Sequence, residues 1–288
     1  MRIGVCTTDF EPMDCDGLFK KIKSHGFECV QFSFVSILEM LEAEFEPTGE
    51  IEIPVEIADT VIGLVKSCAA KYNIAVPAIN GTFNMTHPDK SVRDEGVKRL
   101  EVLCRAASKI GAGFITLCSG TRLRENLWGY HKDTSQPDAW ADFIDAARQT
   151  VKIAERYNII LAVEPEYGNI INSPENAERM MAEVGSPNLK MIMDCANLFH
   201  PSEAKRENVH KIMSRAFEVF GNDIVVAHGK DISSSDGIKF CAAGEGIVDY
   251  KLFVELLRKH NYQGDMFMHS IYDEDKMAQG IEVVAKHL

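Results

Sequence analysis

The chain has 288 residues, of which 45% are hydrophobic and 26% charged, and its formal net charge is −12. These values exclude a disordered or fibrous chain and disfavour a nucleic-acid partner, because no lysine and arginine run offsets the negative charge. The first residues carry no basic stretch followed by an apolar core, and no run of about 18 apolar residues occurs, so we expect a cytoplasmic protein that does not enter a membrane.

Short β-branched or apolar runs alternate with segments of helical period along the whole chain. The predicted strands are 3–7, 29–34, 74–79, 113–118, 159–163, 190–193, 224–227 and 265–268. The predicted helices are 15–25, 55–72, 91–110, 137–157, 175–184, 203–220, 249–260 and 274–287. Ser173 followed by Pro174 is typical of a helix beginning, and Gly26, Gly111 and Gly185 follow helical runs where C-cap glycines occur.

Eight alternating units predict an α/β fold, a (β/α)₈ TIM barrel that forms one domain over 1–288, because parallel strands need crossover helices and a closed barrel has no edge. A doubly wound open sheet is the alternative, but residues 5–12 contain no glycine and therefore no dinucleotide-binding G-x-G-x-x-G motif. We expect a loop insertion at about 35–54 and a long loop at about 119–136, which together form the pocket wall. The eight cysteines form no C-x-x-C pair, so most are predicted to be buried thiols.

Polar residues follow most of the predicted strands, where a barrel of this kind places its active site. Glu164 and Glu166, then Asp194 and Asn197, then His228 and Lys230, and finally His269 follow the last four strands, while Asn84 and His87 follow the third and Arg122 the fourth. Glu164, Asp194 and His228 supply the mixed oxygen and nitrogen ligands that suit Mn²⁺, Zn²⁺, Co²⁺ or Mg²⁺. The alternative for each is a helix cap or a loop salt bridge.

Each of the other candidate site residues has both a functional and a purely structural interpretation. His87 is a substrate contact or a cap before Pro88, and Lys230 is an electrophile or a solvated lysine bonded to Asp231. Trp128, with Tyr130, is a wall for a sugar face or a residue that packs its own loop. Arg122 and Arg124 receive a phosphate or carboxylate, or they pair with Glu125 in the loop.

Six local motifs resemble the sugar phosphate isomerase/epimerase family, which has a xylose isomerase-like barrel. They are G-T-F-N-M-T-H-P-D at 81–89, C-S-G-T-R at 118–122, A-V-E-P-E at 162–166, M-D-C-A-N-L-F at 193–199, A-H-G-K-D at 227–231 and A-G-E-G at 243–246. The resemblance implies a divalent metal, manganese first, held by Glu164, Asp194 and His228. It also implies a small sugar or sugar phosphate as substrate and pairing of chains into a homo-oligomer. The candidate substrate contacts are Asn84, His87, Arg122, Trp128, Asn197 and Glu245.

One departure bears on the mechanism. His269, in Met-His-Ser, stands where the family commonly has a fourth metal-binding glutamate, so the two-glutamate arrangement of an epimerase is missing. This favours an isomerase in which Glu164 or Glu166 moves a proton through an enediolate and His269 or Lys230 is the second group. His269 is also the candidate fourth metal ligand.

Three other functions remain open from the sequence. A metal-dependent dehydratase or related lyase on a keto-sugar or polyol would use the same residues and differ only in its product. A hydrolase resembling the DNA-repair endonucleases of this barrel would need a larger histidine set and a surface that tolerates DNA. A sugar-binding barrel without catalysis would use the carboxylates as helix caps.

Overall fold

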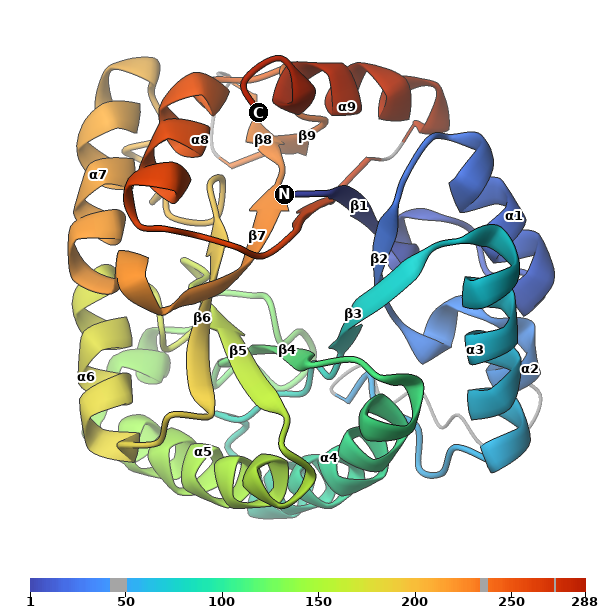
Figure 1. Ribbon diagram of the computed structural model, residues 1–288. Coiled ribbons are helices and arrows are strands. Elements are labelled where there is room, and N and C mark those ends of the chain that lie inside the picture. The colour runs from blue at the N-terminus through green and yellow to red at the C-terminus, as the bar shows by residue number, and fades with distance from the viewer. Residues whose placement is uncertain (42–50, 234–237, 272) are drawn as a thin grey trace.

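The computed structural model describes residues 1–41, 51–233, 238–271 and 273–288. Eight parallel strands close into a barrel in the order β1-β10-β7-β6-β5-β4-β3-β2, which confirms the predicted single-domain TIM barrel architecture (Figure 1). The barrel strands are β1 (Ile3–Cys6), β2 (Cys29–Phe32), β3 (Ala75–Asn80), β4 (Phe114–Cys118), β5 (Ile160–Glu164), β6 (Leu189–Asp194), β7 (Ile224–Gly229) and β10 (Met266–Met268). The sequence did not predict the short antiparallel pair β8 (Asp231–Ile232) and β9 (Phe240–Cys241).

Helices surround the barrel, as Figure 1 shows in the view along its axis. They are α1 (Cys15–Ser24), α2 (Leu38–Leu41), α3 (Asp59–Tyr72), α4 (Lys90–Ile110), α5 (Pro137–Tyr157), α6 (Pro174–Val184), α7 (Val209–Phe220), α8 (Tyr250–Lys259) and α9 (Met277–Ala285). The helix predicted from residue 203 begins only at Val209. Residues 201–203 form a turn in which the Glu203 amide donates to the His200 carbonyl, and Arg206–Asn208 form a short 3₁₀ helix.

The predicted helix ends are present. Ser173 caps α6 by accepting a hydrogen bond from the Asn176 amide at 3.2 Å, and Pro174 is the first residue of that helix. Gly111 and Gly185 end α4 and α6 in the left-handed region, with φ of 94° and 66°, where glycine has no steric cost. The alternation of strands and helices was therefore readable from local signals.

A cluster of apolar side chains fills the inside of the barrel. Seven of the eight barrel strands each contribute one buried residue, and Phe114 of β4 packs against them partly buried. The seven are Cys6, Cys29, Ala78, Ala162, Ile192, Val226 and Phe267. Because this layer closes the interior, polar side chains at the carboxyl ends of the strands collect above it rather than inside it.

Two mid-helix glycines predict opposite effects of the same substitution. A Cβ on Gly96 of α4 would lie 2.1 Å from the Phe83 ring, whereas a Cβ on Gly63 of α3 would meet nothing within 4 Å. We expect Gly96→Ala to destabilise the fold by about 1–3 kcal/mol through overpacking, and Gly63→Ala to stabilise it by about 0.5–1 kcal/mol through helix propensity. Urea unfolding of both variants checks this, and equal changes in both would contradict it.

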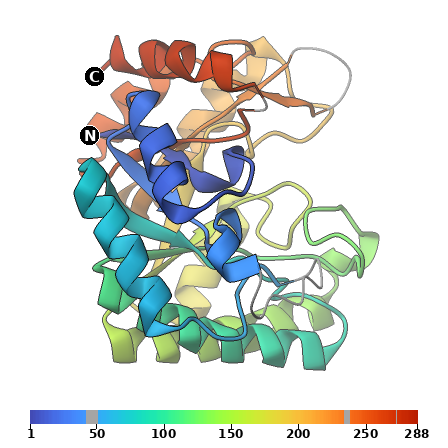
Figure 2. The same ribbon diagram turned by 90° about the vertical axis from the view of Figure 1, so that its right-hand side faces the viewer.

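The two ends of the barrel differ. Figure 2 shows both chain termini at one end, while the loops that follow the strands, including 119–136, extend from the other. Of the expected insertion at 35–54, residues 42–50 lie outside the described residues; Ile51 pairs with Phe83 in an isolated bridge.

Every described helix is too short or too polar to traverse a lipid bilayer. Seven of the cysteine thiols are buried and that of Cys241 is half-buried, as expected.

Candidate metal centre and active site

Three side chains converge at the carboxyl ends of adjacent strands. Glu164 is the last residue of β5, Asp194 the last of β6, and His228 lies opposite Asp194 in the pairing of β6 with β7. One ligand atom from each lies within 4.8 Å of the others. The three residues are 7%, 1% and 2% exposed. The strand-end residues predicted to hold a metal therefore do come together in a buried group.

The imidazole of His228 is held from both sides. Its Nδ1 lies 3.1 Å from Glu164 Oε1 and 3.7 Å from Asp194 Oδ2, and its Nε2 lies 2.8 Å from Oε1 of Gln31. With Nε2 donating its proton to Gln31, Nδ1 faces the two carboxylates, which is the orientation that a ligating histidine needs. Gln31, on β2, was not identified from the sequence as part of the site. The only indication in the sequence is that Gln31 is a polar residue in an otherwise apolar strand.

Charge interactions in this group are strong. Burial opposes a charged imidazole, but the carboxylates of Glu164 and Asp194 outweigh it and raise the pKa of His228 to about 9. Burial likewise opposes ionisation of Asp194, yet the charges of Lys230 and His228 outweigh it and hold the pKa of Asp194 well below its usual range. Glu164, Asp194, His228 and Lys230 thus form one group of buried ion pairs.

The donor set fits a divalent cation. Asp194 Oδ1 accepts hydrogen bonds from the amides of Ala196 and Asn197, as a cap would, but the buried Oδ2 accepts none from any described residue. Most buried polar atoms accept or donate a hydrogen bond, so Oδ2 retains the capacity to bind a cation. Oδ2 faces the His228 imidazole and the Lys230 ammonium, 3.7 and 3.4 Å away. Two carboxylates and one imidazole suit Mn²⁺, Zn²⁺ or Co²⁺.

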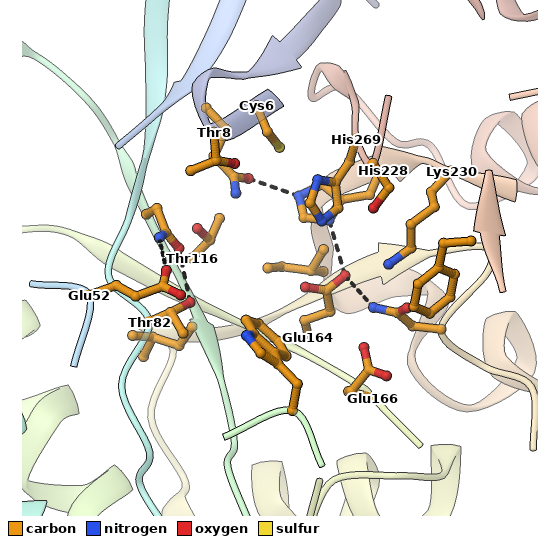
Figure 3. A pocket seen from close by; sticks show the side chains of 18 of the residues that line it. Cys6, Thr8, Glu52, Thr82, Thr116, Glu164, Glu166, His228, Lys230 and His269 are labelled. Carbon is orange, nitrogen blue, oxygen red and sulfur yellow. Dashed lines mark hydrogen bonds and ion pairs between the residues drawn. The ribbon is translucent and has the colours of Figure 1, made fainter. Parts of the chain in front are cut away.

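A cavity of about 550 Å³ opens beside this centre (Figure 3). Of the residues predicted from the sequence, Glu164, Glu166, His228, Lys230, His269, Asn197 and Trp128 line it. Trp128 from the long loop and Glu52 from the insertion confirm that these two loops contribute to the wall. Gln31, Glu52, Asn80 and Thr82 are lining residues that were not predicted.

Two ionisable groups flank the centre within the cavity. Burial raises the pKa of Glu166 to about 8, although the nearby Lys230 acts in the opposite direction. The Lys230 ammonium is buried, 3.4 Å from Asp194 Oδ2 and 3.8 Å from the centroid of the Phe240 ring. Lys230 is therefore not a solvated lysine paired with Asp231, whose carboxylate accepts backbone amides instead.

His269 lies next to the centre but outside the group of three. Its ring centroid is 5.6 Å from that of His228, and its Nδ1 is 3.6 Å from Asp9 Oδ1. Nδ1 is buried and makes no hydrogen bond with the described residues. Asn197 contacts the centre directly, because its amide donates to Glu164 Oε1 at 2.9 Å.

Four predicted substrate contacts lie away from the cavity. Asn84 accepts the amides of Thr86 and Thr121, and the Nδ1 of His87 accepts the Asp89 amide at 3.0 Å. Glu245 pairs with Lys276 at 2.6 Å. None of these three residues, nor Arg122, is among the described lining residues.

Arg122 braces the long loop from within. Its guanidinium pairs with Asp138 at 3.0 Å and Asp142 at 2.8 Å, and it donates to the Thr86 carbonyl at 3.1 Å. Asp138 and Asp142 belong to α5, so the guanidinium connects the loop to that helix. The predicted loop ion pair with Glu125 is replaced by pairs with residues of the helix.

The sequence is similar to a known protein family and to a curated relative. A family model described as "Xylose isomerase-like TIM barrel" matches residues 19–287. Inosose dehydratase of Glaesserella parasuis is 21% identical over 145 residues, 46% of this chain, and the match spans about half (48%) of that relative's length.

Solved structures share the fold. The apo structure of 3-keto-D-glucoside 4-epimerase YcjR from E. coli superposes with a TM-score of 0.74 at 17% identity, covering 99% of both chains. The IolI protein with a bound zinc atom superposes with a TM-score of 0.72 at 14% identity, covering 100% of this chain and 99% of the other.

Proposed function

Because the chain belongs to the xylose isomerase-like TIM barrel family, we propose that it is a metal-dependent isomerase or epimerase that moves a proton beside the carbonyl group of a small hydroxylated substrate. The observation that carries this proposal is the buried group of Glu164, Asp194 and His228 at the edge of the cavity. An epimerase among the structural neighbours and a dehydratase among the relatives support the same kind of carbonyl chemistry.

We assign the metal to Glu164, Asp194 and His228, with His269 as the proposed fourth ligand. A bound divalent cation would supply Lewis-acid polarisation of a carbonyl oxygen and stabilise the negative charge that develops there. Mn²⁺ is our first choice because carboxylate ligands suit it, and the zinc atom in the IolI structure supports a divalent ion in this type of barrel.

We assign the transfer of the substrate proton to Glu166. Glu164 already accepts a hydrogen bond from Asn197 and contacts His228, whereas Glu166 lines the cavity without being part of the ligand group. A carboxylate in this place can take a proton from one carbon and return it to its neighbour on the same face, as a 1,2-isomerase requires. Lys230 lines the same cavity and is the proposed second acid/base group, and His269, which also lines the cavity, takes that role in its place if it does not bind the metal.

A dehydratase is the second candidate, and the similarity to inosose dehydratase favours it. In that reaction Glu166 would again remove the proton, and Lys230 or His269 would then protonate a departing β-hydroxyl group. The substrate would lose water, so its mass would fall, whereas isomerisation leaves the mass unchanged.

Removal of metal tests the proposal. We expect the protein purified without chelator to hold about one ion per chain, dialysis against EDTA to abolish turnover, and Mn²⁺ to restore it. Elemental analysis gives the stoichiometry, and mass spectrometry of the products in D₂O separates the two reactions. Deuterium at the exchanged carbon with no other mass change indicates an isomerase or epimerase, and loss of water indicates a dehydratase. About three zinc ions would instead favour the endonuclease class, and no metal even after reloading would favour a sugar-binding barrel.

A further inference from the structure

We infer that the cavity binds an uncharged polyhydroxylated carbonyl compound rather than a phosphorylated one, and that Glu52, Asn80 and Thr82 recognise its hydroxyl groups. The inference rests on the proposed function and narrows its substrate class. Three groups of contacts carry it: a polar wall opposite the candidate metal centre, two sets of backbone amides that internal carboxylates occupy, and a lysine that is already paired.

The polar wall is preorganised. Asn80 donates from Nδ2 to Glu52 Oε2 at 2.7 Å, and Thr82 donates from Oγ1 to Asn80 Oδ1 at 2.9 Å. The Glu52 amide also donates to the Thr82 carbonyl at 2.8 Å, which fixes the insertion against the end of β3. Together these side chains offer acceptors and donors without a fixed positive charge. Such a wall suits hydroxyl groups, which both donate and accept.

This wall faces the candidate metal centre. In the barrel, three strands separate β3 from β7 in either direction, so the end of β3 lies across the opening from His228. Figure 3 shows Glu52 and Thr82 on one side of the cavity, with His228, Glu164 and Lys230 on the other. A substrate whose carbonyl group lies at the centre therefore directs its remaining hydroxyl groups toward Glu52.

An internal carboxylate occupies the first place where barrels commonly hold phosphate, after the eighth strand. The amides of Ser270 and Ile271, directly after β10, donate to the two Asp9 carboxylate oxygens at 3.1 and 3.3 Å. Ser270 has φ of 58°, and a left-handed residue of this kind lets successive amides converge on one anion. Asp9 is the anion in this chain.

A second internal carboxylate occupies the corresponding place after the seventh strand. Asp231 accepts the amides of Ile232 at 2.8 Å, Val248 at 2.9 Å and Gly244 at 3.0 Å. The backbone closes tightly here, because a Cβ on Gly246 would lie 2.3 Å from Asp231 Oδ1. These amides are therefore not available to a substrate phosphate.

The Lys230 side chain, which lines the cavity, is already paired within the protein. Lys230 is the only lysine or arginine among the described lining residues, and its ammonium contacts Asp194 and the Phe240 ring. In the sequence, residues 42–50 and 234–237 contain no lysine or arginine. A phosphate in the cavity would thus meet the acidic side chains of Glu52, Glu164 and Glu166, and among the described lining residues the one lysine or arginine side chain is already paired with Asp194.

The test measures binding of matched pairs by isothermal titration calorimetry to the Mn²⁺-loaded protein. The probes are D-fructose, D-psicose, D-tagatose and 2-keto-myo-inositol, each beside a monophosphate of the same compound. We expect at least one uncharged probe to bind at least about tenfold more tightly than its monophosphate. Tighter or equal binding of the monophosphates, or no binding of any uncharged probe, would overturn the inference.

Glu52→Gln tests the wall itself. Glutamine keeps the size of the side chain but removes its charged acceptor, so affinity for the uncharged probe should fall about tenfold. The control is Glu56→Gln, an exposed residue that does not line the cavity and should leave the affinity unchanged. Equal affinities of both variants would contradict the role of Glu52.

The readout separates this inference from the proposed function. A chain that binds an uncharged probe tightly but never turns it over with any metal would count against the proposed function alone. Metal-dependent turnover of a monophosphate in preference to its uncharged partner would count against the inference alone.

Discussion

Asp194→Asn is expected to remove the bound metal and to lower turnover by about 10³-fold. Asparagine keeps the shape and the acceptor for the amides of Ala196 and Asn197, but it removes the charge of the oxygen that faces His228 and Lys230. His228 and Lys230 would then lose the carboxylate that both of them contact. A metal contributes several kcal/mol of transition-state stabilisation, which corresponds to about this loss of rate.

The control for this variant is Asp223→Asn. Asp223 precedes β7 at the opposite end of the strand from His228 and pairs with Lys190 on a partly exposed surface. We expect it to retain metal and turnover. Elemental analysis and steady-state kinetics measure both variants, and circular dichroism confirms that each is folded. An Asp194→Asn protein with one ion per chain and full turnover would refute the assignment of the metal centre.

Glu166→Gln should lower kcat by about 10²–10⁴-fold while leaving about one metal ion per chain. Glu166 lines the cavity two residues after Glu164 but is not among the three residues whose ligand atoms converge. Glutamine fills the same space and cannot transfer a proton. The combination of lost turnover with retained metal separates an acid/base role from a ligand role.

Glu178→Gln, an exposed position on α6, is the matched control and should behave like the unmodified protein. Deuterium incorporation from D₂O gives a second readout, because a variant without its base should also stop exchanging the substrate proton. If Glu166→Gln loses its metal, Glu166 belongs to the ligand set. If it keeps full activity, the proton must be assigned to another residue.

The fold was predictable because its determinants are local. Alternating apolar runs and helical periods identified all eight barrel strands, and Ser173, Gly111 and Gly185 identified helix ends through contacts within a few residues. The grouping of Glu164, Asp194 and His228 was also within reach. Adjacent parallel strands bring their carboxyl ends together, so residues at the same place in successive units must meet.

The remaining features depend on contacts between distant segments. Gln31 meets His228 across 197 residues of sequence, and Glu52 meets Asn80 only because the insertion crosses the end of β3. Arg122, which we expected to bind a phosphate or carboxylate, pairs instead with Asp138 and Asp142 on α5 and does not line the cavity.

By itself the sequence determined the barrel and the candidate metal ligands, since periodicity, caps and strand ends are encoded within a few neighbouring residues. Only the tertiary structure decided which polar side chains point into the cavity and which brace the loops. The direction of a loop side chain depends on the partners that reach it from other strands and helices. The same packing placed the carboxylates of Asp9 and Asp231 on backbone amides that follow β10 and β7.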